Sequence, residues 1–253
     1  MTGTSGEVQA TVFEAAFWGF VAGAALLLGA GLGLRFHFSH RVIGLVMAFG
    51  AGTLISSLTL ELTAEAYSRA GLDAVVIGLP LGALAFYLGD RLVEGWGGRH
   101  RKRSRGQQSD GAAAGIVLGA VLDGIPESLV IGISLIAGEG IGVAFVAAVF
   151  ISNIPEALSS SRGLHKAGHS SAAILRMWSL VVVASAVAAA LGFGLLGGAS
   201  EMLIAGIQAF AAGAILTMLA DTMMPEAFDE AGRTVGLMTV FGYACGVALT
   251  IVA

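Results

Sequence analysis

Charged residues are scarce in this chain of 253 residues, of which only 12% are Asp, Glu, Lys or Arg and 56% are hydrophobic. A soluble domain usually needs about a quarter of its residues charged. The mean hydropathy of +0.86 points the same way. The composition therefore excludes a soluble globule and indicates an integral membrane protein. Cysteine is also scarce, and the single Cys245 excludes a disulfide within the chain.

Long apolar stretches are what the chain has instead. A transmembrane helix needs roughly 20 predominantly apolar residues. Eight stretches meet this requirement, at 12–34, 42–66, 73–95, 111–136, 141–163, 172–196, 201–227 and 235–253. We predict an all-α integral membrane fold with eight transmembrane helices and a single domain, 1–253. The first stretch is too long for a signal peptide and has no basic segment before it.

The basic residues are distributed unevenly around these spans. With eight spans, all Lys and Arg residues except Arg69 fall on one side of the membrane. The positive-inside rule makes that side cytoplasmic, so both termini lie outside and the polar loop 97–110 lies in the cytoplasm. We expect a multi-pass protein of the plasma or inner membrane, with the lipid bilayer as its partner and no nucleic-acid partner.

The sequence contains an internal repeat. Residues 48–71 align without a gap on 209–232, at a constant offset of 161. The identities include Ala48-Phe49, Gly52, Glu65-Ala66 and Ala70-Gly71. By extension, spans one to three (12–95) match spans six to eight (172–253), with two central spans (111–163) between them. Five spans separate equivalent helices, so the repeats have opposite orientation, which is typical of transporters.

Seven carboxylates are expected at membrane depth, with no Lys or Arg beside them. They are Glu61, Glu65, Asp123, Glu127, Glu156, Asp221 and Glu226, on spans two, four, five and seven. Each costs about 2.5–3.5 kcal/mol at a helix centre, so protonation, water or a bound cation must compensate it. We therefore predict an inner bundle of these four spans that encloses a cation pathway.

Four of these carboxylates are predicted to line the transport pathway: Glu61, Glu65, Asp221 and Glu226. Glu65 and Glu226 lie near span ends, where snorkelling to the interface is the alternative.

Proline is rare as well, and three of the four prolines directly precede a glutamate: Pro126, Pro155 and Pro225. Proline inside a helix removes one N–H group and frees the carbonyl four residues earlier. We predict helix kinks at these positions, with free carbonyls at Leu122, Ile151 and Asp221. Such hard oxygen ligands suit divalent cations.

Spacing indicates one shared metal site. Asp123 and Glu127 are four residues apart, so both point from one face of span four. Ser152 and Glu156 repeat this spacing on span five, next to Asn153. If the two helices face each other, they can offer carboxylates, a hydroxyl and an amide to one ion. The predicted ligands are Asp123, Glu127, Ser152, Asn153 and Glu156.

These segments carry a family resemblance. Asp123-Gly-Ile-Pro-Glu-Ser128 and Ser152-Asn-Ile-Pro-Glu-Ala157 resemble the paired His-Asn-x-Pro-Glu-Gly signatures of ZIP (Zrt/Irt-like) metal transporters, in particular a prokaryotic type. The resemblance implies a 3+2+3 arrangement and a metal site between spans four and five, with Glu127 and Glu156 as shared carboxylates. It also implies transport toward the cytoplasm by an elevator-like or rocking movement.

The motifs also diverge from that family. Asp123, Gly124 and Ser152 replace its usual residues, and none of the five histidines lies mid-span. Oxygen-only ligands weaken the expectation of zinc, so manganese, iron and cadmium stay open as substrates. A proton-coupled carrier without a metal, or an intramembrane metalloenzyme, is the alternative. No HExxH motif favours the enzyme, and no catalytic residue or cofactor is expected. A homodimer is left open.

Overall fold

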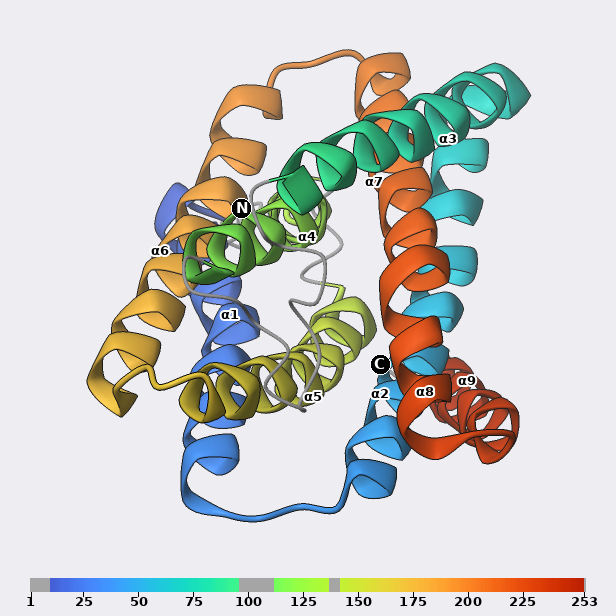
Figure 1. The fold of residues 1–253 in the computed structure, drawn as a ribbon. Coiled ribbons are helices and arrows are strands. Elements are labelled where there is room, and N and C mark those ends of the chain that lie inside the picture. Colours follow the sequence, from blue (N-terminus) through green and yellow to red (C-terminus); the bar gives the residue numbers. More distant parts are fainter. Residues whose placement is uncertain (1–9, 96–111, 137–141, 253) are drawn as a thin grey trace, which may run out of the picture.

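The computed structural model describes residues 10–95, 112–136 and 142–252, and every regular element among them is helical. The elements are α1 (Val12–Arg35), α2 (His40–Ser57), η1 (Leu58–Thr63), α3 (Ala64–Gly95), α4 (Ala112–Ser134), α5 (Val143–Lys166), α6 (Ser171–Leu196), α7 (Glu201–Met218), η3 (Leu219–Met223), α8 (Met224–Ala231) and α9 (Thr234–Val252) (Figure 1). The all-helical prediction is confirmed. The loop 97–110 lies outside the described residues.

Seven helical stretches of the described chain are long and apolar enough to cross a membrane, where the sequence predicts eight spans. The difference arises in one stretch of 56 residues, His40–Gly95. At Gly71 the backbone leaves the helical region, with φ 74° and ψ −165°, so two helices meet there without a loop. A straight helix of that length would measure about 84 Å, nearly three times the roughly 30 Å hydrocarbon core. Two predicted spans are therefore joined in this one stretch.

Side-chain hydroxyls mark where four of the helices begin. Thr11, Ser39, Ser170 and Ser200 each accept a hydrogen bond from the backbone N–H three residues later, at 3.2–3.4 Å. Each bond satisfies one of the N–H groups that have no partner within the first helical turn. The starts of α1, α2, α6 and α7 are thus determined locally by the sequence.

The internal repeat recurs in the structure. Helix α2 runs from His40 to Ser57, and adding 161 to both numbers gives the bounds of α7, Glu201 and Met218. A π-helical segment follows in each case, η1 after α2 and η3 after α7. Gly71 and Gly232, also 161 apart, then turn the chain with positive φ angles of 74° and 65°. The same succession of elements therefore occurs twice.

The helices pack in two groups. Helix α3 packs along α7, and α2 packs along α9 and α8, whereas α1 packs against α5 and α6, and α4 against α6. In Figure 1 the group of α1, α4, α5 and α6 lies on the left, and α2, α7, α8 and α9 lie on the right. The main contacts between the groups are those of α2 with α5 and of α4 with α7.

The helices at this junction are more buried than the others. In the apolar part of each stretch, the buried share is 72% for α5 and 61% for α4, against 33% for α6 and 17% for α9. Large apolar side chains of α6 and α9, among them Leu195, Leu237 and Val252, are exposed. In a membrane such a surface faces lipid, which is consistent with polar residues on the inner helices.

Close helix packing within a group depends on glycine. A Cβ atom added at Gly213 would lie 2.0 Å from the carbonyl oxygen of Leu79, and one added at Gly52 would lie 2.1 Å from that of Thr239. Gly52 and Gly213 are equivalent in the repeat, so the same contact is made twice, between α2 and α9 and between α7 and α3. Small residues allow this approach of two backbones.

We predict that Gly213→Ala destabilises the protein, because the added methyl group would overlap a carbonyl that cannot rotate away. Overpacking of this kind costs about 1–3 kcal/mol. Gly206→Ala is the matched control on the same helix, since no atom lies within 4 Å of its added Cβ. Thermal unfolding in detergent should show a lower midpoint for Gly213→Ala alone, and equal midpoints would contradict the packing.

Candidate metal-binding site

The five predicted ligands lie on two buried helices. Asp123 and Glu127 lie on α4, and Ser152, Asn153 and Glu156 lie on α5; all five are between 3% and 9% exposed. Carboxylates are rarely buried this completely unless their charge is compensated. The burial that the sequence predicts is thus present on both helices.

Two of the five already bond to backbone carbonyls. The Ser152 hydroxyl donates to the carbonyl of Val149 at 2.9 Å, and the Asn153 amide donates to the carbonyl of Ala22 on α1 at 3.3 Å. Helix α2 also approaches here, because a Cβ added at Gly50 would lie 2.9 Å from the Cα of Ser152. Ser152 therefore lies where the two helix groups meet.

The carboxylates are not gathered around a common point. Among the residues that the structure describes, no three His, Cys, Asp or Glu side chains are arranged to hold a metal ion. The reason lies in the packing, since α4 packs chiefly on α6 and α5 chiefly on α1, with few contacts between α4 and α5. The role of Asp123, Glu127 and Glu156 as ligands stays a prediction.

The three Pro-Glu pairs occupy different settings. Pro126 and Pro155 lie inside α4 and α5, which continue through them, whereas Pro225 lies in the first turn of α8, just after η3. The first repeat has an equivalent π-helical segment, although Ala64 takes the place of Pro225. The helix distortion in this region therefore does not require the proline, and both repeats share it.

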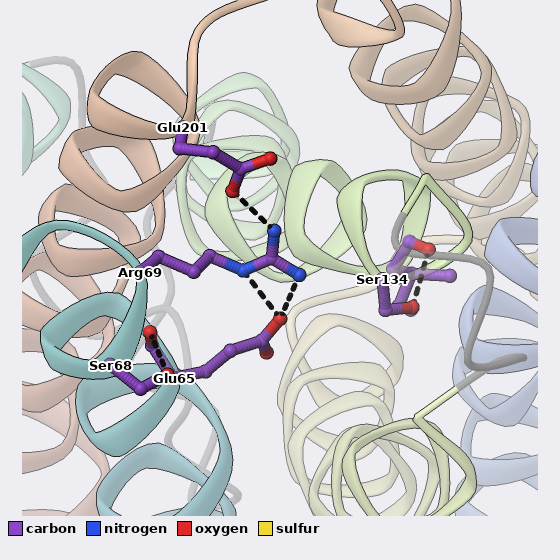
Figure 2. A network of polar contacts seen from close by, with 6 residues as sticks. Glu65, Ser68, Arg69, Ser134 and Glu201 are labelled. Atoms are coloured by element: carbon purple, nitrogen blue, oxygen red, sulfur yellow. Dashed lines mark hydrogen bonds and ion pairs between the residues drawn. The ribbon is translucent and has the colours of Figure 1, made fainter.

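Glu65 has a basic partner, contrary to the expectation from sequence. The Arg69 guanidinium donates to Oε1 of Glu65 through Nε at 2.9 Å and Nη2 at 2.6 Å, and through Nη1 to Oε2 of Glu201 at 2.8 Å (Figure 2). Arg69 follows Glu65 by four residues, so the two share one helix face. This spacing predicts the pair of Glu65 and Arg69. The contact with Glu201 on α7 cannot be predicted from residues close to Arg69 in the sequence.

A second charge contact occupies the equivalent place in the repeat. His40 Nδ1 lies 2.7 Å from Oε2 of Glu230. Glu230 corresponds to Arg69 at the offset of 161, and His40 corresponds to Glu201. Each contact joins the first residue of α2 or α7 to the other repeat, with the acidic and the basic residue exchanged. The site prediction omitted the residues of these two contacts, and the repeat alignment is the feature of the sequence that relates them.

Glu61 and Asp221 lie in the two π-helical segments. Oε2 of Glu61 accepts a hydrogen bond from the backbone N–H of Phe145, and Oε1 accepts one from the hydroxyl of Thr250, both at 3.2 Å. Asp221 is exposed on η3. π-Helical segments occur often at functional sites. Glu226 lies in the first turn of α8 and is half-buried.

Comparison with known proteins gives one informative similarity. No family model matches the chain. The chain is 25% identical over 232 residues to a protein of Arabidopsis thaliana named "Putative zinc transporter", and the match covers 90% of this chain. It covers only 36% of the length of that plant protein. That relative is named as a transporter and not as an enzyme.

We predict a measurable but small coupling between Arg69 and Glu201. Because Glu201 is largely exposed, a double-mutant cycle with Arg69→Gln and Glu201→Gln should give a coupling free energy of at most about 1 kcal/mol. Unfolding in detergent measures it, and salt should weaken it. A coupling free energy of zero at low salt would show that the ion pair does not join α3 to α7.

Proposed function

We propose that the chain carries a divalent metal cation across a membrane toward the cytoplasm, with zinc as the first candidate and manganese, iron or cadmium as alternatives. The main support is the burial of three carboxylates on α4 and α5, Asp123, Glu127 and Glu156. A bound cation would offset the free-energy cost of burying these carboxylates in an apolar protein. The plant relative's name and the Pro-Glu motifs of the ZIP type agree with this proposal.

The proposed topology has eight spans in a 3+2+3 arrangement. It treats His40–Gly95 as two spans that meet at Gly71, and it assigns opposite orientations to the two repeats. Both termini are then outside the cell, in the plasma or inner membrane. The inner spans are those of α2, α4, α5 and α7, and the shared contacts of these helices support that assignment.

In this proposal the metal is bound as substrate by Asp123, Glu127 and Glu156, with Ser152 and Asn153 beside them. Glu61, Glu65, Asp221 and Glu226 lie along its route. An elevator-like or rocking movement of α4 and α5 relative to the second helix group then exposes the site to each side of the membrane in turn. Alternating access in transporters of repeated architecture uses such movements.

A second candidate is a proton-coupled carrier of another solute. It is favoured by one observation: the described residues contain no three-ligand metal group. In that case the buried carboxylates would exchange protons with the solvent and would bind no metal. Metal uptake by the purified protein distinguishes the two functions.

We predict that Glu127→Gln/Glu156→Gln strongly lowers metal uptake into proteoliposomes, because the amides keep the shape of the side chains and lose their charge. Loss of a group that only orients a metal ligand already costs about 10–100-fold, so uptake should fall by at least about tenfold. Initial rates with zinc, manganese, iron and cadmium measure the effect and rank the substrates.

The matched control is Glu14→Gln, a half-buried carboxylate in the first turn of α1. It should transport like the parent. Uptake by the double variant at the parent's rate would refute the site assignment. A parent protein that takes up none of the four metals would favour the second candidate.

A further inference from the structure

Glu61 forms hydrogen bonds to both helix groups. It lies on η1, between α2 and α3, in the same group as α9. Its Oε1 accepts from Thr250 on α9, and its Oε2 accepts from the backbone N–H of Phe145 on α5, in the other group. A Cβ added at Gly142, just before α5, would lie 3.3 Å from the same Oε2. One carboxylate therefore touches both groups at the start of α5.

The bond to Phe145 replaces a cap that α5 lacks. Gly142 precedes the helix and has no side chain, so this N-cap residue cannot accept from the first N–H groups of α5 through a side chain. The first intrahelical bond runs from Val146 to Gly142. A carboxylate at a helix N-terminus also interacts favourably with the helix dipole. Glu61 thus stabilises the start of the helix that contains Ser152, Asn153 and Glu156.

The contact occurs in one repeat and not in the other. The residue equivalent to Glu61 is Thr222, whose hydroxyl donates to the carbonyl of Met218 within its own helix at 2.8 Å. Two identical repeats of opposite orientation would favour equally two arrangements that are related by a two-fold rotation. A hydrogen bond that only one repeat can make stabilises the arrangement in which it forms. The equilibrium shifts toward that arrangement by the difference in the free energy of the bond between the two.

We propose that Glu61 is a positioning residue: its carboxylate holds the first turn of α5 against the second helix group, and the bond to Phe145 breaks and reforms in each transport cycle. The inference rests on the proposed function, because only a transport cycle requires the two groups to move. It assigns Glu61 to the control of helix position and not to metal binding.

A cross-link across this contact tests the proposal. Gly142→Cys/Thr250→Cys, made in a Cys245→Ala background, keeps Glu61 and allows a bis-methanethiosulfonate to join α5 to α9 through two disulfide bonds. Joining them should reduce zinc uptake into proteoliposomes by about tenfold, because the cross-link blocks a movement that the transport cycle requires. Cleavage of the cross-link by reductant should restore uptake. Full uptake by the cross-linked protein would overturn the proposal.

The matched control is Met224→Cys/Thr239→Cys, whose parent side chains contact each other within the second group at 3.8 Å. Cross-linking this pair should leave uptake unchanged. Loss of uptake with both pairs would overturn the proposal, because the effect would not depend on movement between the groups. Uptake of zinc, manganese, iron and cadmium by the untreated parent is measured in parallel, and the absence of uptake of all four would refute the proposed function itself.

A second variant separates positioning from metal binding if the cysteine pairs fold poorly. Glu61→Gln should lower the maximal rate of zinc uptake by at least about threefold and leave the half-saturating zinc concentration unchanged. Glu14→Gln should change neither quantity. A raised half-saturating concentration at an unchanged maximal rate would make Glu61 a ligand, and no change in either would remove its role; both outcomes contradict the proposal.

Discussion

Compensation of buried carboxylates is the constraint on which the rest of this structure depends. In an apolar surrounding, a carboxylate must find a donor, a cation or a proton. Glu65 is compensated by Arg69, and Glu61 accepts hydrogen bonds from a helix N-terminus and a hydroxyl, while His40 lies beside Glu230. Asp123, Glu127 and Glu156 are more deeply buried, on α4 and α5, and in the proposed function these three bind the transported cation.

The two helix groups explain how such a site can be both buried and reachable. Within a group, glycines such as Gly52 and Gly213 bring backbones so close that sliding would require overlap with carbonyls. Between the groups the main contacts are those of α2 with α5 and α4 with α7, supplemented by Glu61. The predicted ligands lie on α4 and α5, on one side of that boundary.

Much of the fold could be predicted from sequence because hydrophobicity and capping are local. The helix positions agree with the apolar stretches, and the offset of 161 recurs in helix bounds, π-helical segments and turning glycines. The π-helical segments could not be predicted, since one additional residue in a turn leaves no periodic signal. The span count differed because Gly71 joins two helices without a polar loop. Pairs such as Arg69 and Glu201 depend on packing between distant segments, which composition does not encode.

The position of the bound metal tests the central claim most directly. Crystals of the protein soaked with zinc or manganese, and measured at the absorption edge of the metal, locate the ion without reference to activity. The proposed site predicts an anomalous peak between α4 and α5 whose nearest atoms are carboxylate oxygens of Asp123, Glu127 or Glu156. A peak elsewhere in the membrane-spanning region, or no peak at a metal concentration that saturates uptake, would contradict the assignment.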